Sequence, residues 1–160
     1  MVSISLLCVG KLKESHWRDA CAEYIKRLST YCRAQVIEVA EERVADNPSA
    51  AQIAATVEAE GKRLLSHITA DSLVIALCIE GKEMDSAQLS QYIQKATVNG
   101  ASKIVLVIGG SWGLSDSVKS RADLRLSMSP MTFPHQLARV MVLEQLYRSF
   151  QIASGGKYHK

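Results

Sequence analysis

The stretch Lys103-Ile-Val-Leu-Val-Ile-Gly-Gly-Ser-Trp-Gly113 decides the fold class of this chain. After the opening lysine comes a continuous apolar run, mostly β-branched, which is typical of a parallel strand covered on both faces. Glycines follow at once, and glycine lets the backbone turn sharply and approach a ligand that binds free N–H groups. The stretch therefore predicts a buried strand that leads directly into a glycine loop.

The same pattern continues on both sides of this stretch, where short apolar runs alternate with segments of helical periodicity. Such alternation favours a parallel sheet with helices on both faces, so we expect one α/β domain over residues 1–160. Asn47-Pro48 should open a helix, and Glu80-Gly-Lys82 should turn the chain out of its strand. The expected strands are 2–9, 35–39, 72–79, 103–108 and 124–128, and the expected helices are 15–31, 47–68, 85–99, 116–121 and 135–153.

Composition excludes several classes of protein. The chain is 48% hydrophobic, and its longest apolar run, residues 73–79, is far shorter than the ~20 residues that cross a bilayer. The N-terminus alternates like a strand and lacks the cationic start of a signal peptide, so no membrane segment is expected. The four cysteines form no C-x-x-C pair and the four histidines lack metal-ligand spacing. We therefore expect a cytoplasmic protein with reduced thiols and no metal.

Charge is distributed unevenly along the chain, although the net charge is only +3. Residues 119–160 hold seven basic and two acidic side chains, whereas residues 1–118 are slightly acidic. A basic C-terminal third of this kind hints at a polyanionic partner, and ordinary solvated charges explain it about equally well.

Ligands of parallel α/β sheets bind outside the carboxyl ends of the strands, which here means the loops after Ile79, Ile108 and Met128. The loop Gly109-Gly-x-x-Gly113 lacks the spacing and the following acidic residue of a dinucleotide fingerprint. It is either a tight turn or a ligand-binding loop. The proline-containing stretch 128–134 is either a preorganised wall for a flat ligand such as adenine or a rigid connection to the last helix.

Two further features lie near the C-terminus. His135 and Arg139 are four residues apart, so they share one face at the start of the final helix. They form either an anion site or a capping and surface pair. Gly155-Gly156 then precedes Tyr158 and His159 in a tail that is either functional or simply disordered.

A set of motifs extends from the first strand to the last residue of the chain. They are Val9-Gly-Lys11, 108–114, Leu126-Ser127, 131–136, Arg139-Val140, 144–148 and Tyr158-His-Lys160. Each motif is weak alone, but together they are specific. As a set they resemble the ribosomal RNA large subunit methyltransferase H family, which belongs to the SPOUT superfamily of trefoil-knotted methyltransferases.

This resemblance implies a knotted SPOUT methyltransferase domain over residues 1–160, with 155–160 as a functional C-terminal tail. The activity it implies is S-adenosyl-L-methionine-dependent methylation of N3 of a pseudouridine in the helix 69 loop of 23S rRNA, on the assembled ribosome. Family members are homodimers whose cofactor lies in the knotted loops. The residues that the resemblance assigns to the cofactor are Leu77, Gly109, Met128, Ser129, Pro130, Met131, Thr132 and Phe133.

Methyl transfer from a sulfonium is an in-line displacement that requires no metal, so catalysis consists of positioning and of removing the N3 proton. Arg139 stays protonated and would stabilise the ring anion through directed hydrogen bonds. His159 or His135 would accept the proton, because imidazole titrates near neutrality, and we favour the tail histidine. Tyr158 would close over the target base and stack on it.

The final helix also predicts an assembly. Val140, Met141, Val142 and Leu143 follow one another, so apolar side chains point in every direction around the helix. One side of the helix can pack on the sheet. The opposite side would be left exposed, so we expect it to form a homodimer interface.

The alternative function is a non-enzymatic ribosome-assembly or RNA-binding factor of the same fold, which would use the same basic surface without a cofactor pocket.

Overall fold

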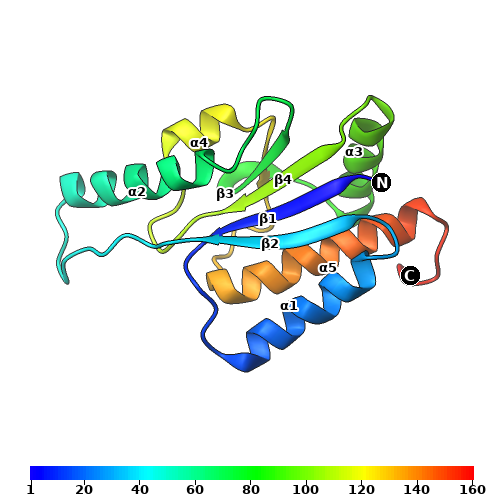
Figure 1. Cartoon of the computed structure of the whole chain (residues 1–160), viewed down its shortest axis with the longest axis horizontal. Helices are drawn as coiled ribbons and strands as arrows, with labels where there is room; N and C mark the ends of the chain where they lie inside the picture. The colour runs from blue at the N-terminus through cyan, green and yellow to red at the C-terminus, as the bar shows by residue number, and fades with distance from the viewer.

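Strands and helices alternate along the entire chain in the computed structural model, which describes residues 1–160 (Figure 1). The strands are β1 (Ser3–Val9), β2 (Arg33–Val39), β3 (Leu73–Glu83), β4 (Lys103–Ile108) and β5 (Leu124–Ser127). The helices are α1 (Ser15–Leu28), α2 (Ala50–Leu65), α3 (Ser86–Val98), α4 (Asp116–Arg121) and α5 (His135–Ala153). The predicted order of strands and helices is therefore confirmed.

The strands form one sheet in the order β2-β1-β4-β3-β5, and every neighbouring pair is parallel. β4 lies at the centre, where Leu106 is level with Leu6 of β1 and Ile75 of β3. Because all the strands run the same way, their carboxyl ends share one edge of the sheet. The predicted α/β class with a parallel sheet is confirmed, and the loops after β3, β4 and β5 meet at that edge.

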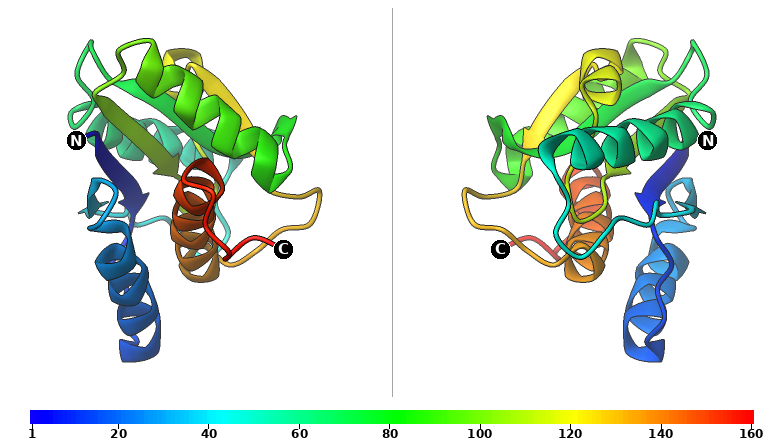
Figure 2. Two further views of the ribbon diagram at one scale, coloured as in Figure 1. Left: turned by 90° about the vertical axis from the view of Figure 1, so that its right-hand side faces the viewer. Right: turned by 90° about the vertical axis from the view of Figure 1, so that its left-hand side faces the viewer.

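Helices cover both faces of the sheet (Figure 2). α1, α3 and α5 pack on one face, and α2 and α4 pack on the other. Successive residues of a strand point to opposite faces, so Leu6 and Cys8 pack toward α5, whereas Leu7 and Val9 pack toward α2 and α4. All four side chains are buried, as expected for a strand between two helical layers.

The start of α2 differs from the prediction. Ser49, not Asn47, is the N-cap: its Oγ accepts a hydrogen bond from the Gln52 N–H at 3.2 Å. Gln52 Oε1 in turn accepts a bond from the Ser49 N–H at 2.8 Å. This capping box satisfies two backbone donors at once, which fixes the helix start after the proline. The helix expected over 47–68 is therefore too long at both ends.

β3 continues to Glu83, so the turn expected at Glu80-Gly-Lys82 is wrong. The strand bulges instead, because Leu77 and Lys82 both pair with Leu126 of β5. A Cβ atom on Gly81 would lie 2.7 Å from the carbonyl carbon of Arg125, so a glycine is required where the two backbones approach. The bulge brings residues 78–80 beside the loops that follow β4 and β5.

Candidate active site

A pocket opens at the carboxyl edge of the sheet, where the loops after β4 and β5 meet the bulged part of β3. This cavity, which we call the loop pocket, has a volume of about 380 Å³. Three separate segments of the chain contribute to it, as the sequence predicts for the loops after Ile79, Ile108 and Met128. All the residues assigned to the cofactor line it except Pro130, namely Leu77, Gly109, Met128, Ser129, Met131, Thr132 and Phe133.

The glycine loop after β4 folds back on itself. The Gly113 N–H donates a hydrogen bond to the Gly110 carbonyl at 3.1 Å, and Gly113 has a φ of +84°. A Cβ atom on Gly109 would lie 2.7 Å from the carbonyl carbon and oxygen of Gly113. The loop is therefore a tight turn and also a wall of the pocket, so the two interpretations of this motif do not exclude each other.

The stretch after β5 is held by its own small polar groups. The Ser127 hydroxyl donates to the Ser129 carbonyl at 3.2 Å, and the Met131 N–H donates to Ser129 Oγ at 3.0 Å. The Met131 side chain is 74% exposed, and Pro134 is the N-cap of α5. The stretch thus connects β5 to α5 and lines the loop pocket with Met128, Ser129, Met131, Thr132 and Phe133.

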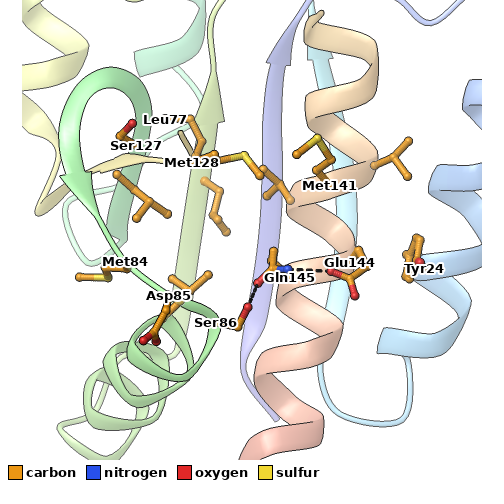
Figure 3. Close-up of a pocket in the computed structure, with 15 residues that line it drawn as sticks. Tyr24, Leu77, Met84, Asp85, Ser86, Ser127, Met128, Met141, Glu144 and Gln145 are labelled. Atoms are coloured by element: carbon orange, nitrogen blue, oxygen red, sulfur yellow. Dashed lines mark hydrogen bonds between the residues drawn. The ribbon is translucent and has the colours of Figure 1, made fainter. Parts of the chain in front are cut away.

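A second cavity lies on the other side of Leu77 and Met128, between α3 and α5 (Figure 3). This helix pocket has a volume of about 520 Å³ and is mainly apolar. Tyr24 of α1, Met84 before α3 and Met141 of α5 contribute to its walls. Because the two cavities share residues from the ends of β3 and β5, an occupant of either one contacts the same part of the sheet.

Arg139 is not at the surface, contrary to the interpretation of it as a capping and surface residue, and it lines neither the loop pocket nor the cleft beside it. Its side chain is fully buried, and its Nη1 donates to Glu38 Oε2 at 2.6 Å. Its Nη2 donates to the carbonyls of Gly10 at 2.7 Å and Val9 at 3.3 Å, whereas Nε has no partner. Burial is the largest single influence on the pKa of Glu38 and raises it. The hydrogen bonds from Arg139 and from the Leu12 N–H, together with the charges of Arg139 and Lys11, outweigh burial and hold that pKa below its usual value. The guanidinium thus anchors the start of α5 to the ends of β1 and β2.

His135 lies between two cavities. It lines the loop pocket and also an adjoining polar cleft of about 670 Å³ at the ends of β1 and β2. Its Nδ1 is buried without a hydrogen-bond partner. Burial, reinforced by the charge of Arg139 and opposed by Glu41, lowers the pKa of His135. The imidazole is therefore neutral at physiological pH and has a nitrogen free to take a proton.

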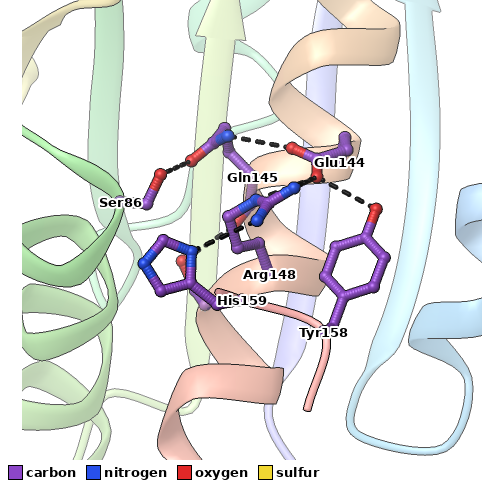
Figure 4. A network of polar contacts seen from close by, with 7 residues as sticks. Ser86, Glu144, Gln145, Arg148, Tyr158 and His159 are labelled. Carbon is purple, nitrogen blue, oxygen red and sulfur yellow. Dashed lines mark hydrogen bonds and ion pairs between the residues drawn. The ribbon is translucent and has the colours of Figure 1, made fainter. Parts of the chain in front are cut away.

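The C-terminal tail docks on its own α5, away from the loop pocket (Figure 4). The Gly156 N–H donates to the Gln151 carbonyl at 2.8 Å, which starts the return of the chain along the helix. The Tyr158 hydroxyl donates to Glu144 Oε1 at 3.1 Å. His159 Nδ1 lies 3.2 Å from a guanidinium nitrogen of Arg148.

These tail contacts include aromatic packing. The Tyr147 ring lies edge-on to the Tyr158 ring at 4.9 Å between centroids, and the Arg148 guanidinium lies 4.7 Å from the Tyr158 ring centre. Burial first, then Tyr24 and Glu144, raise the pKa of Tyr158 to about 12. Its hydroxyl is therefore a hydrogen-bond donor rather than a base at neutral pH. The tail is ordered in this position, which differs from the disordered end that the sequence left open.

Sequence reasoning missed two acidic residues around these sites. Glu38 pairs with Arg139, and Glu60 of α2 is only 4% exposed behind the glycine loop. The pair of Glu144 with Arg148 can be read from the i, i+4 spacing in the sequence, but the contacts of Glu38 and Glu60 join distant segments. Nothing in the local pattern could have found them.

The structure was also searched for metal sites, disulfides and membrane-spanning helices. No group of three or more histidine, cysteine, aspartate or glutamate side chains is arranged to hold a metal ion. All four cysteines are free thiols, and burial raises the pKa of Cys8 to about 12. No helix is both long enough and apolar enough to cross a membrane.

Comparison with known proteins identifies close relatives. The family model described as "Predicted SPOUT methyltransferase" matches residues 2–159. Over 159 residues the chain is 50% identical to Ribosomal RNA large subunit methyltransferase H of Clostridium botulinum, covering 99% of this chain and 100% of that protein. It is 48% identical to the protein of the same name from Bifidobacterium adolescentis, with the same coverage.

Two solved structures have a similar fold. A "probable methylase family protein" from Haemophilus influenzae Rd KW20 matches with a TM-score of 0.56 and 16% identity, covering 99% of this chain and 71% of that one. A "Probable Methyltransferase" from Bordetella pertussis Tohama I matches with a TM-score of 0.59 and 14% identity, covering 92% of this chain and 96% of that one. Similarity at this level of identity establishes the shared fold alone.

Proposed function

Because this chain belongs to the ribosomal RNA large subunit methyltransferase H family of SPOUT methyltransferases, we propose that it methylates N3 of a pseudouridine in the helix 69 loop of 23S rRNA. The methyl donor is S-adenosyl-L-methionine, and the substrate is the assembled ribosome in the cytoplasm. The observation that carries this proposal is the loop pocket, which gathers residues from three segments that the family resemblance assigns to one cofactor. The trefoil knot of the SPOUT fold is part of the proposal.

The loop pocket fits S-adenosyl-L-methionine in size and chemistry. Its volume of about 380 Å³ falls in the usual range of small-molecule sites, ~300–1,000 Å³. Leu77 and Phe133 offer apolar walls, and the backbone of residues 128–133 offers donors and acceptors to the edge of an adenine ring. The lack of a side chain on Gly109 lets the Gly113 backbone close the turn that forms this wall of the pocket. When bound, S-adenosyl-L-methionine supplies an electrophilic methyl group, and the chain's own residues orient the reactants and exclude water.

The N3 proton of the target base is removed by a histidine. His135 lines the loop pocket, and its lowered pKa keeps the imidazole neutral at physiological pH, so it can accept this proton when the base lies within hydrogen-bond reach. His159 is the second candidate, and it acts only if the tail leaves its place on α5. Tyr158 keeps its proton, because its pKa is about 12, and therefore stacks on the base instead of acting as a base catalyst.

Arg139 has a role that follows from its burial. In this conformation its guanidinium donates hydrogen bonds to Glu38 and to two backbone carbonyls, so it cannot contact a substrate. It fixes the first turns of α5, and with them His135, against the sheet. Direct stabilisation of a ring anion by Arg139 would require the guanidinium to leave Glu38.

Dimerisation is a further part of the proposal. Val140 and Met141 are only partly buried in a single chain, and the helix pocket that they line is apolar. A second copy of the chain is the partner that this surface fits, about a two-fold axis beside α1 and α5. The tail of one copy then lies near the loop pocket of the other. Light scattering should give twice the chain mass of 17.5 kDa at micromolar concentration, and the monomer mass would contradict this part of the proposal.

Two measurements separate the enzyme from a non-enzymatic ribosome-assembly factor. Calorimetry with S-adenosyl-homocysteine should show binding to an enzyme and none to an assembly factor. Transfer of labelled methyl from S-adenosyl-L-methionine should then occur to assembled ribosomes from cells that lack this protein, and more weakly to free rRNA. Absence of both binding and transfer would favour the assembly factor.

A further inference from the structure

Glu60 of α2 carries a buried carboxylate that the proposed mechanism does not use. The residue is only 4% exposed, although glutamate is rarely buried without an ion-pair partner. Its Oε2 accepts one hydrogen bond, from the Glu42 N–H at 3.1 Å, and its Oε1 has no partner. Arg63, on the same helix, forms its ion pair with Glu42 instead. The carboxylate of Glu60 therefore uses only one of its several acceptor positions.

This carboxylate lies against the glycine loop. A Cβ atom on Gly110 would be 3.2 Å from Oε1 and 3.3 Å from Oε2 of Glu60, so any side chain there would press on both oxygens. Gly110 also lines the loop pocket, whereas Glu60 does not. Gly110 thus contacts the pocket and the carboxylate at once, and a movement of the loop changes the surroundings of Glu60.

The glycine loop carries hydrogen-bond donors that have no partner in the protein. The Gly113 N–H donates to the Gly110 carbonyl and closes the turn. The N–H groups of residues 109–112 donate to no backbone carbonyl and to no side chain. A buried acceptor without a partner therefore lies against a loop with free donors, and pairing them would remove the cost of the unpaired oxygen.

The charged groups that face Glu60 come from two elements. The segment after β2 contributes the carboxylates of Glu41 and Glu42, and α2 contributes Arg63. β1 and the glycine loop hold no charged residue. Burial first, then Glu41 and Glu42, raise the pKa of Glu60 against the opposing effects of the Glu42 N–H and Arg63. A hydrogen bond donated to Oε1 would favour the ionised carboxylate and lower this pKa.

We propose that Glu60 positions the glycine loop for the cofactor: when S-adenosyl-L-methionine occupies the loop pocket, the N–H of Gly110 or Ser111 turns to Glu60 Oε1 and binds the ionised carboxylate. Glu60 is a positioning residue, because it acts on the cofactor only through the backbone of the loop. Cofactor binding and ionisation of Glu60 then favour each other, as linked equilibria must. Affinity falls as Glu60 becomes protonated in acid, and binding in that range releases a proton to the buffer. This inference rests on the proposed function, since the cofactor is what fills the loop pocket.

The test is calorimetry with S-adenosyl-homocysteine in two buffers that differ in heat of ionisation, which counts the protons released on binding. It uses the whole chain, from about pH 7.5 down to about pH 5. Wild type should release almost no proton at the neutral end and a growing fraction of a proton toward the acid end, while its affinity falls.

Glu60→Gln separates the two roles of the carboxylate, because it keeps an acceptor oxygen and cannot ionise. It should fold, release no proton on binding, and bind about fivefold more weakly at neutral pH, the difference between a charged and a neutral hydrogen bond. Glu58→Gln, the same change at an exposed position of α2, should behave as wild type. Proton release in Glu60→Gln equal to that of the wild type would overturn the proposal.

A second variant tests the contact from the side of the loop. Gly110→Ala places a methyl group against both carboxylate oxygens, so it should weaken binding at least about tenfold in the otherwise unchanged chain. The same substitution should cost less in a chain that also carries Glu60→Ala, where the carboxylate is gone. Equal losses in the two chains would show that the loop and the carboxylate act independently, which would contradict the proposal.

The remaining outcomes are distinct. Proton release that persists in Glu60→Gln and disappears in His135→Gln would come from the imidazole, which also lines the loop pocket, and the assignment to Glu60 would be wrong. Wild type that binds S-adenosyl-homocysteine without proton release over the whole range would overturn the coupling and leave the cofactor site intact. If the wild type does not bind S-adenosyl-homocysteine at any pH, the proposed function fails first and this inference fails with it.

Discussion

Arg139 of α5 and Glu38 of β2 are 101 residues apart in the sequence, yet Arg139 Nη1 and Glu38 Oε2 meet at 2.6 Å at the carboxyl edge of the sheet. The pair closes the floor beneath His135, which precedes Arg139 by one helical turn. The guanidinium is fully buried, so this carboxylate and two backbone carbonyls replace water in compensating its positive charge. Stability and the placement of His135 therefore depend on the same contact.

Removing the carboxylate should destabilise the fold. Glu38→Gln leaves a buried guanidinium without its counter-charge, and we expect a loss of ~2–3 kcal/mol in the free energy of unfolding. Urea denaturation monitored by circular dichroism measures it. The control is Glu23→Gln, which breaks the exposed pair with Arg27 and should cost less than ~1 kcal/mol. Equal losses in the two variants would show that the buried pair stabilises the fold no more than the exposed pair does.

The same pair makes stability fall in acid. The folded-state pKa of Glu38 is lowered, so its contribution is present above the unfolded value of 4.5 and is lost as pH falls through the folded value. Wild type should therefore lose stability on acidification relative to Glu38→Gln. Denaturation midpoints measured from neutral pH down to about pH 3 should converge, and parallel curves would contradict the assigned shift.

Glu60 should have the opposite dependence on pH. It is buried behind Gly110, where a Cβ atom would lie 3.2 Å from Glu60 Oε1, and that oxygen has no partner. Burial raises its pKa, so its contribution is full below the unfolded value of 4.5 and is lost as pH rises through the folded value. Glu60→Gln should gain stability over wild type as pH rises. Glu58→Gln, the same change at an exposed position of α2, should not.

The glycine loop should tolerate no side chain at its first position. Gly109→Val places a branched group where even a Cβ atom would be 2.7 Å from the Gly113 backbone, so the loop must shift. We expect cofactor affinity to fall at least about tenfold in a folded protein, a loss that corresponds to ~1.4 kcal/mol. Calorimetry with S-adenosyl-homocysteine measures it, with Ala101→Val at the opposite end of β4 as the control. Unchanged affinity would exclude Gly109 from the site.

The tail should be required for transfer and not for cofactor binding. Deleting residues 157–160 should abolish methylation of ribosomes and leave the affinity for S-adenosyl-homocysteine unchanged. Tyr158→Phe should keep most of the rate because the ring can still stack, whereas Tyr158→Ala should lose about tenfold or more. Full activity in the truncated protein would limit the tail to its observed contacts on α5.

The regular part of the fold was predictable because it depends on local patterns. Apolar runs and glycines gave the strands and the parallel sheet, and the expected helices at 116–121 and 135–153 match α4 and α5. The three loops at the carboxyl edge could be anticipated because parallel strands all end on one side. The register of the strands was harder to predict from the sequence. The bulge at Gly81 arises where β3 meets the backbone of β5, and the sequence of β3 alone carries no sign of that contact.

Contacts between distant segments could not be predicted. The sequence gives no sign that Arg139 turns inward to Glu38, so its charge suggested an exposed anion site instead. The docking of Tyr158 on α5 likewise depends on Glu144 and Tyr147, which only the folded tail brings together. The polar cleft combines residues from three segments, and none of them forms a recognisable motif on its own.

Methylation of N3 of a pseudouridine in the helix 69 loop is the activity that we propose for this chain. The most direct test incubates the purified protein and S-adenosyl-L-methionine with ribosomes from cells that lack it, and then maps the 23S rRNA by mass spectrometry. We expect one added methyl group on that pseudouridine, located at N3 by fragmentation, and none when the cofactor is omitted. An unmodified helix 69 loop, or a methyl group on another nucleotide, would contradict it.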